Sequence, residues 1–222
     1  MEHESSRYFT ILYEREVPRE LVQGFFKFLD QAFDTLHDRL GEYPKDGITV
    51  ILYARSSFKS VTLAPEWSGG LYDGKIRMPV GGLKTVEEAV GLLELLVHEM
   101  THAFIYRMAP AGLPLWFNEG LATAIQGWDP GKIRTYFSEH PPDALVSFDD
   151  VDRALRGRGG DVTAAYAAAC LAIGDIVEMR GFGAVRRIIA GVGAGGTFAE
   201  VFRDEARVEV SEFEDRWRRS LR

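Results

Sequence analysis

The chain has 222 residues, of which 46% are apolar and 27% charged, and its formal net charge is −7. These values are ordinary for a globular protein and exclude a disordered or fibrous chain. The length favours a single domain that can bury a core without disulfide bonds. The acidic balance argues against nucleic acid as a partner, because domains that bind nucleic acid present a basic surface.

Compartment and oligomeric state are left open by the sequence. The apolar stretch of residues 164–174 is shorter than the ~18 residues that span a bilayer, so we expect no transmembrane segment in this chain. The N-terminus has neither the basic nor the apolar part of a signal peptide. The chain is expected to be either cytoplasmic or a catalytic segment of a longer exported protein. The single cysteine, Cys170, is expected to be a buried packing residue rather than a nucleophile.

The first third of the chain alternates strands with a helix. Residues 8–13 (YFTILY) predict a short strand, and apolar residues at helical spacing after Pro18 predict a helix that ends near Gly41 and Pro44. A buried strand is predicted at residues 47–53 (GITVILY). Another follows at residues 75–80, where Leu71 and Tyr72 would form its hairpin partner across an Asp-Gly turn.

Only helices are predicted after residue 84. Thr85 to Glu88 form a capping box that begins a long helix to about Met108, and Pro114 begins a shorter helix through Ile125. A second long helix is predicted at residues 163–180, and further capping boxes begin at Thr197 and Ser211. This order predicts an α+β fold: an N-terminal mixed sheet with a packing helix, followed by a mainly helical C-terminal half.

One glycine pattern matches a nucleotide-binding motif. Gly191, Gly193 and Gly196 match G-x-G-x-x-G, but they follow a helical stretch rather than a strand, so a helix end and loop explain them better than a dinucleotide site.

The segment His98-Glu99-Met100-Thr101-His102 is H-E-x-x-H and lies within the capped helix. Residues four apart share a helix face, so the two imidazoles can converge on one ion, with Glu99 near enough to act as a base.

A catalytic zinc site needs three protein ligands and one open position. Glu119, within Leu113-Pro-Leu-Trp-Phe-Asn-Glu-Gly-Leu-Ala122, is the candidate third ligand, and sixteen residues separate it from the second histidine. A chain reversal through Pro110 and Gly112 would bring the second helix back along the first. Gly120 would leave room for a close backbone approach beside the ligand.

The pair HEMTH and LPLWFNEGLA resembles the gluzincin zinc metallopeptidases, which include thermolysin and the large aminopeptidases, and is most similar to their compact peptidase MA-like domains. The resemblance extends from about Tyr8 over most of the chain. It implies one Zn²⁺ per chain, held by His98, His102 and Glu119, with Glu99 as general base on a zinc-bound water. It further implies that Tyr166 hydrogen-bonds the oxyanion, and that residues 75–80 form the edge strand that pairs with an extended peptide.

The chain also departs from the family pattern. The Gly-x-Met-Glu-Asn motif of the aminopeptidases is absent, so the resemblance implies an endopeptidase. Thr123 occupies the position at which thermolysin carries an aspartate four residues after its ligand glutamate. The expected organisation is a single peptidase MA-like domain of residues 1–222, with an α/β subdomain (1–84) and a helical metal-binding subdomain (85–222).

The predicted function is zinc-dependent hydrolysis of peptide bonds in a peptide or protein substrate. Trp67, Leu71 and Tyr72 are candidate substrate-cleft residues, which packing explains equally well. The alternative is a pseudoprotease that retains zinc and acts as a peptide-binding or scaffolding module. Glu99 separates the two, because a purely structural zinc site is closed by four protein ligands and has no use for a base.

Overall fold

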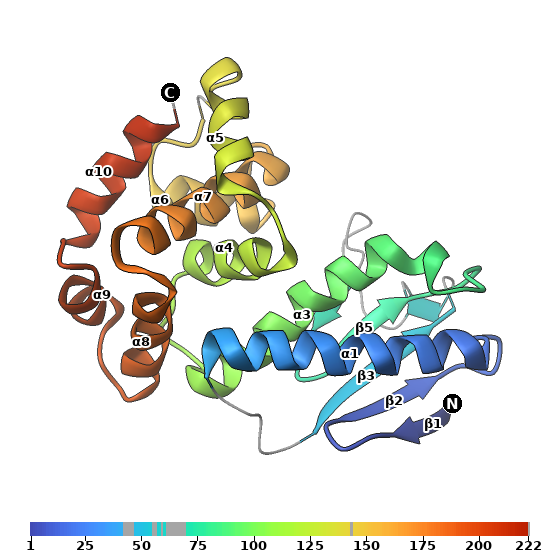
Figure 1. The fold of residues 1–222 in the computed structure, drawn as a ribbon. Helices are drawn as coiled ribbons and strands as arrows, with labels where there is room; N and C mark the ends of the chain where they lie inside the picture. The colour runs from blue at the N-terminus through green and yellow to red at the C-terminus, as the bar shows by residue number, and fades with distance from the viewer. Residues whose placement is uncertain (42–46, 55–56, 59, 61–69, 143, 222) are drawn as a thin grey trace. The chain divides into compact units, whose positions relative to one another are not determined.

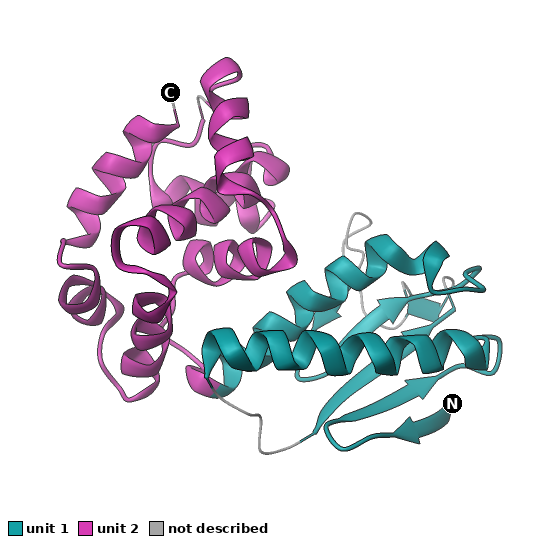
Figure 2. Cartoon of the chain, viewed as in Figure 1, with its two compact units in different colours: residues 1–107 teal, residues 108–222 magenta. Residues whose placement is uncertain are grey.

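The computed structural model describes residues 1–41, 47–54, 57–58, 60, 70–142 and 144–221. The chain forms two compact units, residues 1–107 and 108–222 (Figure 2). The compact units divide within the last turn of the helix that carries H-E-x-x-H. The subdomain boundary expected from the sequence lies earlier in the chain, after residue 84. The α+β fold class is confirmed: a mixed sheet lies in the first unit, and the second is helical in its described residues.

Unit 1 contains one five-stranded sheet with the order β1-β2-β3-β5-β4 (Figure 1). Its strands are β1 (Glu2–Ser5), β2 (Phe9–Tyr13), β3 (Ile48–Tyr53), β4 (Leu71–Tyr72) and β5 (Ile76–Pro79). β2, β3 and β5 are parallel neighbours, while β1 and β4 add antiparallel edges. The expectation that residues 75–80 form the edge strand is therefore wrong. β4 precedes β5 in a hairpin that turns at Gly74, whose φ is +94°, and β4 pairs with the outer side of β5.

Helices α1 (Arg19–Leu40) and α3 (Val90–Met108) pack on one face of this sheet (Figure 1). Phe33 of α1 marks the joint core, since its ring contacts Phe9 of β2 with centroids 5.5 Å apart and Phe104 of α3 at 5.3 Å. Along β2 the buried residues alternate, as expected for a strand with one face on the core. Gly41 ends α1 in the left-handed conformation, as its position after the last apolar residue predicts.

Unit 2 consists, in its described residues, of α4 (Leu115–Gln126), α5 (Pro130–Glu139), α6 (Phe148–Leu155), α7 (Val162–Arg180), α8 (Phe182–Gly193), α9 (Phe198–Ala206) and α10 (Val210–Ser220). The central helix is α7, which contacts each of the other six. An aromatic cluster of Trp116, Phe148, Phe202, Phe213 and Trp217 packs beside it. Gly191 and Gly193 lie within α8, so the G-x-G-x-x-G pattern follows no strand in the described chain.

One helix of the described chain, α7, is long and apolar enough to cross a membrane by length and composition alone. Half of its most apolar window is buried inside the protein. Its small and aliphatic residues from Ala165 to Ile176 face the surrounding helices of unit 2. The core helix of a soluble protein passes the same test, so this hydropathy is explained by packing.

Candidate metal centre

The helix that carries H-E-x-x-H begins with the predicted capping box. The Thr85 hydroxyl accepts a hydrogen bond from the Glu88 main-chain N–H at 3.4 Å, and the Glu88 carboxylate accepts one from the Lys84 N–H at 2.8 Å. A single 3₁₀ turn, Glu87–Ala89, then leads into α3. The cap fixes where the helix begins. The start of the helix in turn sets which residues of the motif, two turns further along, face the core.

His98 and His102 occupy one face of α3. Their rings lie 4.7 Å apart between centroids and are nearly perpendicular, at 81°. His98 is buried, with 6% of its surface exposed, and His102 is half-buried. Two neighbouring imidazoles provide two nitrogen donors of the type that zinc binds.

Glu99 is the buried carboxylate of the same turn, with 7% of its surface exposed. Gly70, the residue before β4, lies against it. A Cβ built on Gly70 would lie 3.3 Å from Glu99 Cγ, 3.3 Å from Leu95 Cδ2 and 3.1 Å from Met78 Sδ. These spacings are tighter than ordinary van der Waals contacts, so only glycine fits at residue 70 without displacing a neighbour. The sequence analysis missed this role of Gly70, because nothing local in the sequence links residue 70 to residue 99.

Glu119 lies in the second turn of α4. Pro114 precedes the helix in an extended conformation, with ψ of 151°, and Gly112 turns the chain with φ of +94°. The Glu119 side chain is half-buried, and its main-chain carbonyl accepts a hydrogen bond from the Thr123 hydroxyl at 2.7 Å. Thr123 is thus satisfied within its own helix, which explains how a buried threonine is tolerated at this position.

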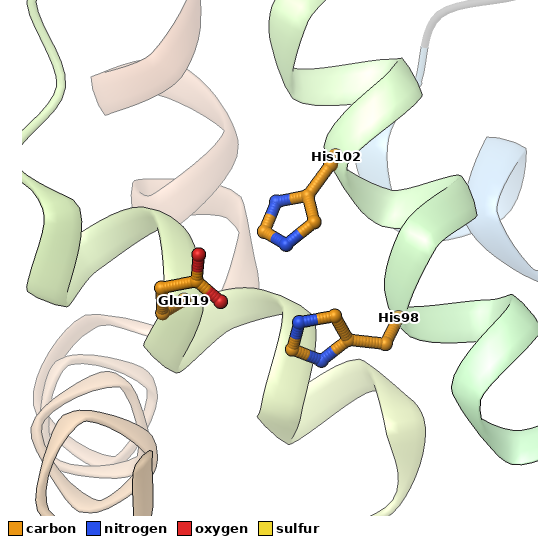
Figure 3. A group of neighbouring side chains, drawn as sticks. All are labelled: His98, His102 and Glu119. Carbon is orange, nitrogen blue, oxygen red and sulfur yellow. The ribbon is translucent and has the colours of Figure 1, made fainter. Parts of the chain in front are cut away.

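The structure brings together the three residues that the sequence singled out as ligands. The ligand atoms of His98, His102 and Glu119 all lie within 4.8 Å of one another (Figure 3). In the close-up, the carboxylate and both imidazole rings point toward a common centre. Two imidazoles and one carboxylate are the donor set of a catalytic zinc site with one position left open, so these side chains fit that metal.

The remaining predicted site residues are distributed over both units. Tyr166 is half-buried on α7, one turn before Ala169, whose main chain lies against Gly120 of α4. It therefore lies on the side of α7 that faces the helix of Glu119. The role of Tyr166 stays a prediction.

Of the predicted substrate residues, Trp67 lies outside the described residues. Leu71 and Tyr72 form β4. The Tyr72 ring packs edge to face on Tyr106 of α3, 6.2 Å away, and burial raises the pKa of the Tyr72 hydroxyl above its usual value of 10.0. Tyr106 is 56% exposed and lies one turn after His102 on the same helix.

Cys170 is buried, as expected. Burial raises the pKa of its thiol to about 12, and the thiol contacts the Trp128 carbonyl at 3.8 Å. Its burial agrees with the expected role of a packing residue.

The comparison with known families agrees with this site. A sequence model described as the Peptidase MA superfamily matches residues 29–222, which include α3, α4 and all of unit 2. No curated protein matches the chain.

Proposed function

The chain belongs to the peptidase MA superfamily, and from this premise we propose that it is a zinc-dependent peptidase that hydrolyses internal peptide bonds. The observation that carries the proposal is the convergence of His98, His102 and Glu119, whose ligand atoms lie within 4.8 Å of one another. Two of these residues flank Glu99, a buried carboxylate in the position of a catalytic base. A ligand set with an adjacent base is what a hydrolytic site requires and what a purely structural site lacks.

We propose that His98, His102 and Glu119 hold the zinc ion. The neutral imidazoles leave the charge of the ion intact, and the single carboxylate halves it. When bound, the ion would polarise the scissile carbonyl and lower the pKa of water toward about 7.

Glu99 is assigned the proton transfers. Its carboxylate accepts a proton from the attacking water and delivers it to the leaving amine as the peptide bond breaks. Support comes from its burial and from the close approach of Gly70, where a Cβ would lie 3.3 Å from Glu99 Cγ. A restricted base loses little freedom when the substrate arrives, which is how fixed geometry contributes to rate.

Tyr166 is assigned to the oxyanion. Its hydroxyl would donate a hydrogen bond to the tetrahedral oxygen, a contact that lowers the barrier because it is strongest in the transition state. Its place on the side of α7 nearest Gly120 supports the assignment. Leu71 and Tyr72 are proposed as substrate contacts, since β4 is the outermost strand on that side of the sheet. Trp67 is retained as a third candidate from the sequence.

The proposal is tested on Glu119. Glu119→Ala is expected to weaken zinc binding by orders of magnitude and to abolish cleavage of a mixed peptide library, while the circular dichroism of the chain is retained. Glu119→Gln should be nearly as damaging, because a neutral amide oxygen is a poor zinc ligand. Glu139→Ala, which removes an exposed carboxylate of α5, is the control and should leave both properties unchanged.

Two outcomes would overturn the proposal. Stoichiometric zinc and normal cleavage by Glu119→Ala would place the third ligand elsewhere. A wild-type protein that binds zinc stoichiometrically but cleaves no peptide in the library would favour the alternative, a zinc-retaining pseudoprotease that binds peptides.

A further inference from the structure

Helix α4, which carries Glu119, begins without a cap of its own. Its N-cap residue is Pro114, which has no side chain that can accept a hydrogen bond. The first main-chain N–H groups of a helix have no partner within the helix and must be satisfied from elsewhere. Asp129, Asp161 and Thr197 cap α5, α7 and α9 locally, so α4 is unlike these neighbours.

The missing cap is supplied by Asp152, from the middle of α6. Its Oδ1 accepts a hydrogen bond from the Trp116 N–H at 2.7 Å, and the carboxylate also bonds the Leu115 N–H. These are the first two residues of α4. Asp152 is half-buried, and burial raises the pKa of its carboxyl above the usual 3.8, while the two N–H groups act in the opposite direction.

The same face of α6 also holds the side chain of Trp116. Phe148 lies one turn before Asp152, and its ring stacks on the Trp116 indole with centroids 3.9 Å apart and planes 9° from parallel. The main chain and the side chain of Trp116 are therefore both fixed by α6. Glu119 follows Trp116 by three residues, less than one turn of α4.

Helix α6 is itself tied to the end of the chain. The Glu214 carboxylate of α10 accepts a hydrogen bond from the Phe148 N–H at 2.7 Å. Trp217, on the same helix, donates from its indole nitrogen to the Ala168 carbonyl of α7 at 3.0 Å. Asp152 is thus an anchored acceptor rather than a surface carboxylate that meets α4 by chance.

We propose that Asp152 is a positioning residue for Glu119: it holds the first turn of α4 and so presents the Glu119 carboxylate in the orientation in which it binds the metal. The inference rests on the proposed function, in which Glu119 is a zinc ligand. Without Asp152 the first turn of α4 frays. Zinc binding must then also order this turn, so the zinc affinity falls. Groups that orient a metal ligand typically change metal affinity by about 10–100-fold when removed.

The experiment measures the zinc dissociation constant by competition with a chromophoric chelator, together with the thermal midpoint of the metal-free protein. Asp152→Ala should raise the dissociation constant by about 10-fold or more. Asp152→Asn keeps an oxygen acceptor and should recover most of the affinity. Asp129→Ala is the matched control, because Asp129 caps α5 with bonds from Gly131 N at 2.8 Å and Lys132 N at 3.4 Å, and α5 carries no site residue. It should lower the midpoint and leave the dissociation constant within about twofold.

The outcomes separate this inference from the function on which it rests. If Glu119→Ala weakens zinc binding while neither Asp152 variant does, the positioning role is wrong and the ligand assignment stands. Equal losses of affinity in Asp152→Ala and Asp129→Ala would reduce Asp152 to general stability and overturn the proposal. An unchanged dissociation constant in Glu119→Ala would overturn both. Should Asp152→Ala fail to fold, Asp152→Ser takes its place, because its hydroxyl oxygen lies one atom closer to the main chain than the carboxylate oxygens. A zinc dissociation constant within about twofold of wild type in that variant would overturn the proposal.

Discussion

Gly120 lies against the main chain of Ala169, so that α4 and α7 approach each other closely beside Glu119. A Cβ built on Gly120 would lie 2.6 Å from the Ala169 carbonyl carbon and closer still to its oxygen. The opposing atoms belong to the backbone of a buried helix and cannot rotate away. Gly120 therefore sets the distance between the helix of the third ligand and the helix of Tyr166.

Gly120→Ala is expected to destabilise the protein by about 1–3 kcal/mol, the usual cost of forcing extra atoms into a packed core. The free energy of unfolding, measured by urea titration, would show it. Gly91→Ala is the control: Gly91 also lies in a helix, but a Cβ there would meet nothing within 4 Å. That variant should be neutral or more stable. Equal stability of Gly120→Ala and the wild type would mean that α4 and α7 are not held at this distance.

Glu99→Gln is expected to retain stoichiometric zinc and to lose catalysis, because an amide preserves the shape of the side chain but cannot accept the proton. Loss of a general base lowers kcat by roughly 10²–10⁴-fold. Glu94→Gln, an exposed change on the same helix, should leave zinc content and kcat unaltered. Loss of metal in Glu99→Gln, or activity within a few-fold of wild type, would remove Glu99 from the mechanism.

Tyr166→Phe tests the oxyanion assignment. Removal of an oxyanion donor costs roughly 10²–10³-fold in kcat, so we expect that loss with little change in KM. Tyr136→Phe changes an exposed tyrosine of α5 and should have no effect. An unaltered kcat in Tyr166→Phe, or a loss of activity explained by a lower thermal midpoint, would mean that Tyr166 is a packing residue.

Asp175 of α7 makes the stability of unit 2 dependent on pH. Its carboxylate pairs with Arg134 at 2.6 Å, yet burial is the largest influence and raises the pKa above 3.8. Between the unfolded and folded pKa values the folded state binds more protons, so this group's contribution falls as pH rises through that window. The unfolding free energy of wild type relative to Asp175→Asn should therefore decrease as the pH rises above the usual carboxyl pKa of 3.8. A constant or rising difference would contradict it.

Local signals predicted much of the fold. Thr85 caps the Glu88 N–H as the capping box requires, although Glu88 returns to the N–H of Lys84 rather than to that of Thr85. At α9 the Thr197 hydroxyl accepts from the Glu200 N–H as predicted, while the Glu200 carboxylate accepts from the Thr197 hydroxyl. The box at Ser211 is wrong: the N-cap of α10 is Glu209, two residues earlier, and the carboxylate of Glu214 accepts a hydrogen bond from the first N–H of α6 instead. A remote N–H group competed for the same acceptor.

Three elements, β1, α5 and α6, were not predicted from the sequence. β1 (Glu2–Ser5) has the residues EHES and is mostly exposed, so it carries no apolar alternation to detect. Helices α5 and α6 are short, and their signals, Asp129 before Pro130 and Ser147 before acidic residues, are easily taken for turns. β4 has only two residues, too few for a pattern to show that it displaces β5 from the edge of the sheet.

For the candidate site, the motifs identified the three residues whose ligand atoms gather, because each lies in a short helical pattern of recognisable spacing. The supporting residues could not be found this way. Asp152 meets Trp116 across 36 positions of sequence, and Gly70 meets Glu99 across the β4–β5 hairpin and the first turns of α3. Such contacts depend on how helices and strands pack, and one sequence contains no periodic trace of them.

Three of the four tryptophans belong to unit 2, and two of them, Trp116 and Trp217, are almost fully buried beside Phe148. Intrinsic fluorescence therefore reports chiefly on unit 2, whereas far-ultraviolet circular dichroism also records α1 and α3 of unit 1. Following urea unfolding with both signals distinguishes one transition from two, since coincident curves are the mark of a single cooperative step. An ion that binds only the folded protein would raise the midpoint, and a chelator would lower it again.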